Sequence, residues 1–234
     1  MDISNDERLG VLFSSGKDSA YAAYLMQKQG YKLVCLITVK SRNPYSYMFH
    51  TPGIDLVPLQ AEAMNLPILE QDSEGVEEIE LWDLKEVLEE AVERYGISGV
   101  VTGAIASIYQ GARIERVCSE LGLRVFSPLW HMKQEDVMKS LLRDGFVFIF
   151  TSVAAQGLDS SWLGKRITED DVDKLVELGA SLGINVAGEG GEFESLVLDS
   201  PLFTKQVEIC RFEVERIDEH TAKIVILDAR LGSK

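Results

Sequence analysis

The chain of 234 residues has only three cysteines and three histidines, and it has no CxxC pair. A zinc ribbon needs closely spaced thiols, so that class is excluded, and a disulfide framework is not expected. The longest compact apolar run, residues 146–150, is far shorter than the roughly 20 residues that span a bilayer. The acidic, polar start (residues 1–7) does not resemble a signal peptide. We therefore expect a cytoplasmic protein with no membrane partner.

Basic residues are also scarce, because 23 Lys and Arg stand against 38 Asp and Glu, for a formal net charge of −15. A protein that binds duplex DNA or tRNA normally needs a basic face to release counterions from phosphates. The sequence has no segregated basic segment, so we expect no nucleic-acid partner. Hydrophobic residues make up 46% of the chain and charged residues 26%, which excludes disorder and indicates a full core.

Short apolar segments alternate with helical patterns over the first 130 residues. Such alternation is typical of parallel βαβ units with right-handed crossovers and helices on both faces of the sheet. The predicted fold class is α/β, with a Rossmann-like parallel five-stranded sheet in a domain of residues 1–130. The expected strands are 9–13, 32–39, 66–69, 98–102 and 124–126, and the expected helices are 20–30, 54–65, an acidic amphipathic helix within 72–95, and 110–121.

The regular alternation of strand and helix patterns ends after Pro128. Residues 131–234 are predicted to form a smaller α+β domain. A helix, a strand and a second helix are followed by a glycine-rich turn, and the chain then closes with a hairpin. The expected elements are helices 134–143 and 169–182, strand 146–151, and hairpin strands 206–217 and 222–227 around the turn 218–220.

The segment 14–19, with the sequence SSGKDS, lies between the first predicted strand and the first predicted helix. In a parallel sheet, ligands collect beyond the carboxyl ends of the strands, and the N-terminus of a helix favours an anion. The segment matches neither the GxxxxGK[ST] phosphate loop nor the GxGxxG dinucleotide fingerprint. The residues expected to bind nucleotide phosphates are Ser14, Ser15, Gly16, Lys17, Asp18 and Ser19, with Gly103 at the end of the fourth strand.

This loop resembles the pyrophosphate-loop signature SGGxDS of the PP-loop ATP pyrophosphatase (adenine nucleotide α-hydrolase-like) superfamily. The resemblance implies cleavage of ATP to AMP and pyrophosphate, usually to adenylate an oxygen that is then displaced. Ser15 stands where the superfamily usually has its first glycine. If this position requires a positive φ, a serine is strained there by roughly 1 kcal/mol.

Three further stretches, 103–118, 161–166 and 188–195, narrow the resemblance to the diphthine–ammonia ligase family, over about residues 9–198. The block EGGEFE within the third stretch is the most specific, and Ser195 replaces a more usual Thr. The resemblance implies that ATP adenylates the carboxyl group of diphthine on translation elongation factor 2, and that ammonia then displaces AMP. It implies ATP and Mg²⁺ as cofactors, and elongation factor 2 and ammonium as partners.

Site residues follow from the chemistry of these motifs. Asp18 is expected to orient Mg²⁺ and Lys17 to hold phosphates, while the carboxylates of the acidic block attract the cationic substrates diphthine and ammonium. A solvated acidic turn is the alternative interpretation of that block. The catalytic candidates are Lys17, Asp18, Glu189 and Glu192, and the substrate-binding candidates are His50, Tyr109, Arg113, Glu189, Gly190, Gly191, Glu192 and Glu194.

Several side chains have both a functional and a packing interpretation. An aromatic wall from Tyr45, Tyr47, Phe49 or Trp162 would hold the quaternary ammonium by cation–π attraction, or these rings simply pack. Arg113 contacts phosphate or a substrate carboxylate, or it forms a salt bridge with Glu115 or Glu120.

Two rival functions stay open. One is a PP-loop tRNA-modifying enzyme that adenylates a base, and the other is an ATP-binding sensor without turnover. The scattered Cys35, Cys118 and Cys210 offer no paired thiols of the kind that thiolases use. No segment is suited to a separate glutaminase, so free ammonium is the expected nitrogen donor. A homodimer is left open by the sequence.

Overall fold

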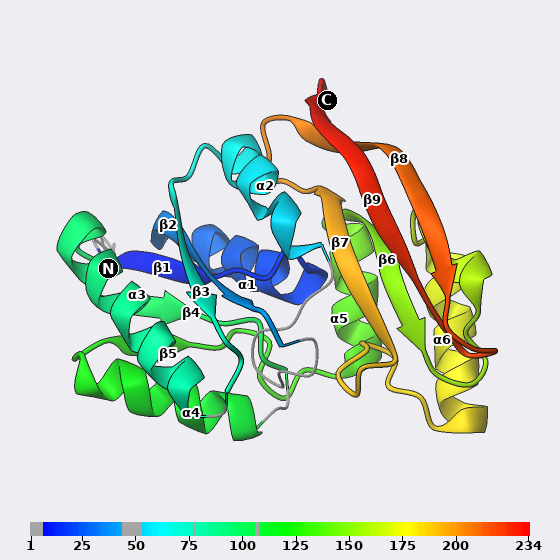
Figure 1. Ribbon diagram of the computed structural model, residues 1–234, viewed down its shortest axis with the longest axis horizontal. Coiled ribbons are helices and arrows are strands. Elements are labelled where there is room, and N and C mark those ends of the chain that lie inside the picture. Colours follow the sequence, from blue (N-terminus) through cyan, green and yellow to red (C-terminus); the bar gives the residue numbers. More distant parts are fainter. Residues whose placement is uncertain (1–6, 44–52, 77, 106–107) are drawn as a thin grey trace.

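The computed structural model describes residues 7–43, 53–76, 78–105 and 108–234, and the side chains of residues 108–110 lie outside that description (Figure 1). The predicted His50, Tyr45, Tyr47 and Phe49, and the side chain of Tyr109, therefore lie outside the described part. In the described residues, no helix is both long and apolar enough to cross a membrane.

The first sheet consists of five parallel strands, which are β1 (Arg8–Leu12), β2 (Lys32–Ser41), β3 (Ile68–Ser73), β4 (Gly99–Val101) and β5 (Arg124–Phe126). Their order in space is β3-β2-β1-β4-β5. The direction of winding reverses between β1 and β4, and in open α/β sheets ligands bind at this switch point, beyond the carboxyl ends of the strands. The predicted parallel five-stranded sheet is confirmed.

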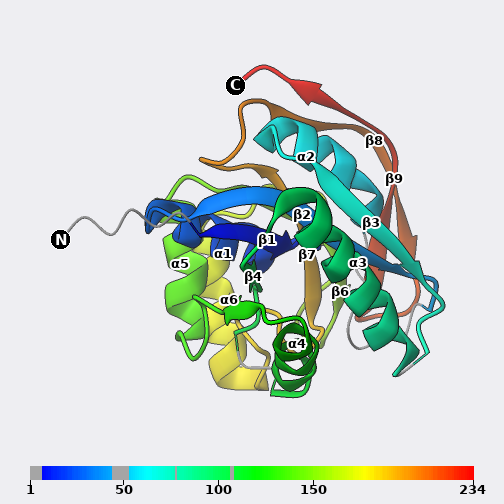
Figure 2. The same cartoon turned by 90° about the vertical axis from the view of Figure 1, so that its left-hand side faces the viewer.

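Helices cover both faces of this sheet, and they are α1 (Lys17–Lys28), the 3-10 turn η1 (Ile54–Leu56), α2 (Val57–Met64), α3 (Ile79–Tyr95) and α4 (Ile108–Glu120). α3 and α4 pack on one face, while α1 belongs to the apolar cluster on the other (Figure 2). In α3 the predicted apolar stripe is buried, including Leu84, Val87 and Leu88. The carboxylate-rich face of this helix is left to solvent, as its helical spacing predicts.

The second sheet is antiparallel and contains β6 (Val147–Ala154), β7 (Phe193–Asp199), β8 (Gln206–Arg216) and β9 (Thr221–Gly232). Its strand order is β7-β6-β9-β8. Two helices and a 3-10 turn accompany it, namely α5 (Gln134–Arg143), η2 (Ser160–Trp162) and α6 (Glu169–Leu182). The smaller α+β unit is confirmed as a fold class, whereas the division of the chain at residues 130 and 131 stays a prediction.

Strand β7 was not expected, because it begins inside the glycine-rich acidic block that the sequence analysis assigned to a turn. Its second half is continuously apolar and buried, and it pairs with β6 in antiparallel register. Strand β3 also differs from its predicted range. It begins after Pro67 and runs beside β2 as far as Ser73, because the parallel ladder continues past the apolar segment.

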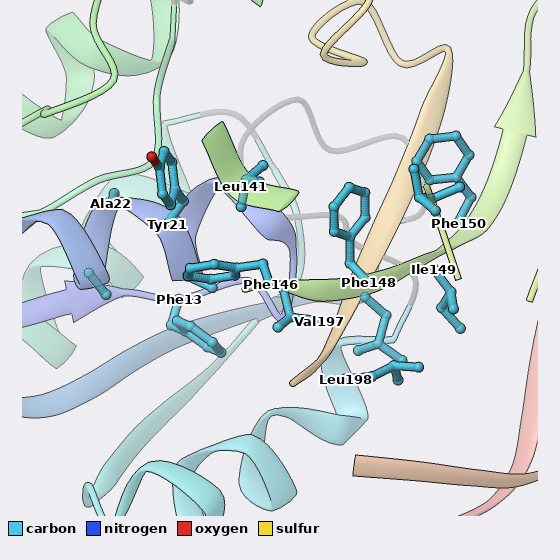
Figure 3. Close-up of a cluster of buried hydrophobic side chains, with 14 of the residues drawn as sticks. Phe13, Tyr21, Ala22, Leu141, Phe146, Phe148, Ile149, Phe150, Val197 and Leu198 are labelled. Carbon is cyan, nitrogen blue, oxygen red and sulfur yellow. The ribbon is translucent and has the colours of Figure 1, made fainter. Parts of the chain in front are cut away.

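The two sheets share one hydrophobic core. Tyr21 of α1 contacts Phe146, with ring centroids 5.4 Å apart and the rings nearly perpendicular. Figure 3 shows this pair beside Phe148 and Val197, which come from the two adjacent strands β6 and β7. Because this cluster is continuous, β7 is held close to α1 and to the loop that precedes it.

Candidate active site

The segment 14–19, called the phosphate loop from here on, connects the carboxyl end of β1 to the first turn of α1. Gly16 is the N-cap of α1 in an extended conformation. The hydroxyl of Ser19 accepts a hydrogen bond from the Ser14 amide (3.2 Å) and donates one to the Gly16 carbonyl (3.1 Å). The first amides of a helix lack intrahelical partners and lie at the positive end of its dipole. The loop is therefore suited to bind a phosphate group.

Ser15 has a φ of +70°, in the left-handed region, and it is fully buried. The position that the superfamily gives to glycine thus has the backbone conformation that glycine tolerates best. The Ser15 carbonyl accepts hydrogen bonds from the Val197 amide (3.1 Å) and from Gln60 Nε2 (3.0 Å). Its hydroxyl is buried without a hydrogen-bond partner in the described part of the chain. The sequence predicts strain at Ser15 if this position requires a positive φ, and the structure meets that condition.

Replacement of Ser15 by glycine should stabilise the protein. Ser15→Gly relieves the left-handed strain and removes an unpaired buried hydroxyl, so we expect the free energy of unfolding to rise by about 1 kcal/mol. Urea denaturation measures the change. Ser15→Ala is the matched control, since it removes the hydroxyl and keeps the strain. A Ser15→Gly protein no more stable than Ser15→Ala would contradict the role of backbone strain.

Lys17 joins the phosphate loop to the acidic block. Its side chain is only 2% exposed, and Nζ donates hydrogen bonds to Asp18 Oδ2 (2.7 Å) and to the carbonyl of Ala187 (2.6 Å). The Lys17 amide donates to Ser195 Oγ (3.2 Å), at the beginning of β7. The ammonium group also lies 5.5 Å from the centroid of the Phe193 ring. The structure thus brings together two motifs that are about 170 residues apart in sequence.

The acidic block forms a tight turn around Glu192. Gly188 and Gly191 have φ values of +78° and +82°, which only glycine adopts without strain. Glu192 Oε1 accepts a hydrogen bond from the Asn185 amide (2.8 Å), and Oε2 accepts one from the Gly190 amide (2.9 Å). Both carboxylate oxygens therefore fix the shape of the turn, while Glu189 lies in the exposed part of the turn.

Glu194 is a carboxylate of the acidic block whose pKa is shifted both by burial and by nearby charged groups. Burial raises its pKa to about 7, from an ordinary value near 4.5. The charges of Asp18 and Glu189 raise the pKa further, and the Lys17 ammonium lowers it. Glu194 lies next to Ser195, whose hydroxyl accepts the hydrogen bond from the Lys17 amide, so the beginning of β7 contacts the phosphate loop. A carboxyl group with such a pKa can gain or lose a proton near neutral pH.

The pH dependence of stability should reveal Glu194. Because its folded pKa lies above the unfolded value, its contribution is most favourable at low pH and is lost as the pH rises from about 4.5 to about 7. At pH 8 and without nucleotide, we expect Glu194→Gln to exceed the wild type in unfolding free energy by roughly 1–3 kcal/mol. Denaturation at several pH values measures this gain, which should shrink toward pH 5. Glu219→Gln, at an exposed turn, is the control. A gain that does not depend on pH would contradict the assignment.

Gly103 follows β4 and lies against the first turn of α1. A Cβ atom at this position would come 2.6 Å from the Ser19 nitrogen and 2.7 Å from the Asp18 carbonyl carbon. Only a residue without a side chain allows this approach of the two backbones. The sequence predicts that Gly103 contacts the nucleotide phosphates. The structure gives it a second reason to be glycine, and the nucleotide contact stays a prediction.

Other predicted side chains contact residues outside the phosphate loop and the acidic block. Arg113 Nη2 lies 3.5 Å from Glu78 Oε1, a partner that the sequence analysis did not name, and Glu120 pairs with Lys85 instead. Trp162 is buried and stacks on Phe150, with ring centroids 6.0 Å apart. Packing therefore accounts for Trp162.

The described residues include two buried cysteines and no cluster of side chains that could bind a metal ion. Cys35 and Cys118 are buried, and burial raises the pKa of both thiols to about 12, so neither is poised as a nucleophile. No group of three or more His, Cys, Asp or Glu in the described part could hold a metal ion by itself. Asp18 Oδ1, however, is buried and has no hydrogen-bond partner among the described residues. One unused carboxylate oxygen beside a phosphate loop is suited to a Mg²⁺ ion that phosphate oxygens also bind.

Two polar side chains that form hydrogen bonds with the phosphate loop were missed. Gln60 of α2 and Ser195 of β7 bind the loop from the side of the second sheet. The signal for Gln60 was a polar side chain on the buried face of a short helix, next to Ala61 and Ala63. For Ser195 the signal was a hydroxyl at the end of the acidic block, which the sequence analysis recorded without a role.

The strand order and the loop at the first β–α turn define the chain as a Rossmann-like α/β protein with a loop suited to bind phosphate. Comparison with protein families matches the diphthamide synthase N-terminal domain to residues 7–125 and the diphthamide synthase C-terminal domain to residues 133–229. The chain therefore belongs to the diphthamide synthase family.

Two individual relatives give a similar result. A diphthine–ammonia ligase of Mus musculus is 37% identical over 221 residues, covering 86% of this chain and 82% of the relative. The corresponding protein of Homo sapiens is 34% identical over 226 residues, with 88% and 84% covered. A solved structure from Methanocaldococcus jannaschii, described as a predicted subunit of tRNA methyltransferase, is 18% identical and covers 83% of this chain and 98% of its own, with a TM-score of 0.44.

Proposed function

We propose that this chain is a diphthine–ammonia ligase, which uses ATP and ammonium to convert the carboxylate of diphthine on translation elongation factor 2 into an amide. The observation that carries the proposal is the direct link between the phosphate loop and the acidic block, through the amide of Lys17 to Ser195 and its ammonium to Ala187. An ATP site and a site for cationic substrates would thus share one crevice. Family membership supports the same reaction, which is the last step of diphthamide synthesis.

The reaction has two steps that transfer groups. First, a carboxylate oxygen of diphthine bonds to the α-phosphorus of ATP, and the bond to pyrophosphate breaks. Then the nitrogen of ammonia bonds to the acyl carbon, AMP leaves with the carboxyl oxygen, and the excess proton passes to a base. The loop amides and Lys17 would stabilise the negative charge that develops on the leaving pyrophosphate.

Asp18 would hold Mg²⁺ through its buried, unpaired Oδ1, together with oxygens of the nucleotide. The ion would supply positive charge beside the phosphate oxygens. Asp18 also keeps the Lys17 ammonium in place, through the ion pair at 2.7 Å. The two side chains would therefore act as a unit on the phosphates.

The carboxylates of the acidic block would receive the cations. Glu189, in the exposed part of the turn, would attract the quaternary ammonium of diphthine. Glu192 would keep the turn in shape, and its negative charge would add to that attraction. Glu194, with a pKa of about 7, is suited to take a proton from ammonium at neutral pH. Arg113, His50 and Tyr109 remain candidates for substrate contacts.

Incubation of the protein with diphthine-bearing elongation factor 2, ATP and [¹⁵N]ammonium tests the proposal. We expect the mass of the factor to change by conversion of one carboxyl group into a labelled amide, with release of AMP and pyrophosphate. Unlabelled glutamine in place of ammonium should give no product. An unmodified factor together with bound ATP would favour a non-catalytic sensor, and salt-sensitive tRNA binding with ATP cleavage would favour a tRNA-modifying enzyme.

A further inference from the structure

Gln60 is a fully buried polar side chain at the junction of three elements. It lies on α2, with an exposed fraction of 0%. Its single amide nitrogen, Nε2, donates hydrogen bonds to the Ser15 carbonyl of the phosphate loop (3.0 Å) and to the Val197 carbonyl of β7 (2.8 Å). Both hydrogens of Nε2 are therefore bonded, whereas Oε1 is buried without a hydrogen-bond partner among the described residues.

The Ser15 carbonyl is held by two donors from outside the phosphate loop. It accepts one hydrogen bond from Gln60 and a second from the Val197 amide, at 3.1 Å. Ser15 is also the residue of the loop with a left-handed backbone, a conformation that needs external support. Two donors on one carbonyl give that support, one from α2 and one from β7.

Anchoring this carbonyl also fixes the direction of the next amide. The bond between Ser15 and Gly16 is a trans peptide, as are all described peptide bonds. In a planar trans peptide the C=O and N–H vectors point in opposite directions. Because Gln60 and Val197 hold the carbonyl on the inner side, the Gly16 N–H is directed away from them, toward the start of α1 where an anion would bind.

We propose that Gln60 is a positioning residue for the triphosphate, which acts by holding the Ser15 carbonyl so that the Gly16 amide is aimed at phosphate. The inference rests on the proposed function, because it assumes that the phosphate loop binds ATP. It also explains why a short helix, whose other buried residues are apolar, buries an amide at this position. Apolar side chains would fill the space, but they could not fix the orientation of the peptide.

The test compares Gln60→Met with the wild type. Methionine has a similar length and no hydrogen bond to offer, so ATP affinity should fall by about tenfold, the factor that corresponds to 1.4 kcal/mol. Calorimetry with a non-hydrolysable ATP analogue measures the Kd, and steady-state kinetics should show a raised KM for ATP with the KM for the protein substrate unchanged.

Met64→Ala is the matched control, since Met64 is buried on the same helix and contacts the shared core. It should lower the melting temperature without changing the Kd for the analogue. An unchanged Kd in Gln60→Met would overturn the inference, and so would an equal loss of affinity in Met64→Ala. Absence of binding by the wild type would overturn the ATP site itself.

A second measurement uses only the wild-type protein. In the wild type, the side-chain amide signal of Gln60 in an NMR spectrum should shift during titration with the ATP analogue, and with the same Kd as calorimetry gives. Addition of ammonium alone should leave it in place. A Gln60 signal that does not respond to a bound analogue would overturn the inference while leaving the proposed function intact.

Discussion

Lys17→Met should lower the rate of pyrophosphate release from ATP by at least about 100-fold, which is the loss typical when one group that stabilises developing charge is removed. Methionine keeps most of the apolar stem, so the side chain should still fill the space between Asp18 and Phe193. What is lost is the ammonium group. The Ala187 carbonyl then has no donor from the phosphate loop, and Asp18 loses its counter-ion.

A coupled assay for pyrophosphate, with diphthine-bearing elongation factor 2 present, measures this loss. Lys17→Arg separates charge from geometry, because guanidinium is charged but is too large for a site with an exposed fraction of 2%. It should also be impaired. The control is Lys205→Ala, which breaks an exposed ion pair with Glu62 and removes no hydrogen bond to the phosphate loop. Wild-type turnover by Lys17→Met would remove the residue from the catalytic set.

Gly103→Ala should both destabilise the protein and weaken ATP binding. A methyl group placed 2.6 Å from the Ser19 nitrogen meets backbone, which cannot rotate away as a flexible side chain can. The first turn of α1 would have to move, and we expect a loss of about 1–3 kcal/mol in unfolding free energy. Since that turn supplies the amides for phosphate, affinity for an ATP analogue should fall as well.

Thermal unfolding with and without the analogue measures both effects at once. Gly111→Ala is the matched control, because a Cβ there would have only ordinary contact with Trp130, at 3.8 Å. Gly111 lies inside α4, so alanine should be neutral or stabilising there by up to about 1 kcal/mol. A Gly103→Ala protein as stable as the wild type would show that the backbones can separate without cost.

Local patterns were enough to predict the first sheet and the phosphate loop. Strand–helix alternation gave the parallel order of elements, and the SSGKDS segment was found where β1 meets α1. The amphipathic spacing in α3 was equally informative, since Leu84 and Leu88 are buried as expected. Each of these features depends on residues close together in the sequence.

The rest of the site depends on contacts between distant segments, which no local pattern contains. The sequence did not distinguish Glu192, which binds amides of its own turn, from Glu194, whose pKa is raised by burial. Nor did it predict that β7 runs beside the phosphate loop, or that Gln60 joins the two. The substitution at Ser15 was noted, but its φ of +70° is known only from the fold.

The support of the phosphate loop by β7 has a consequence for biosynthesis. A ribosome makes residues 14–19 first, whereas Ser195, which lies 178 residues beyond Lys17, and Val197 are made much later, and both bind that loop. A nascent chain that stops short of β7 would carry the loop sequence without its backing. The chain should therefore bind nucleotide only after β7 has been synthesised, and a chain truncated before β7 should be inactive.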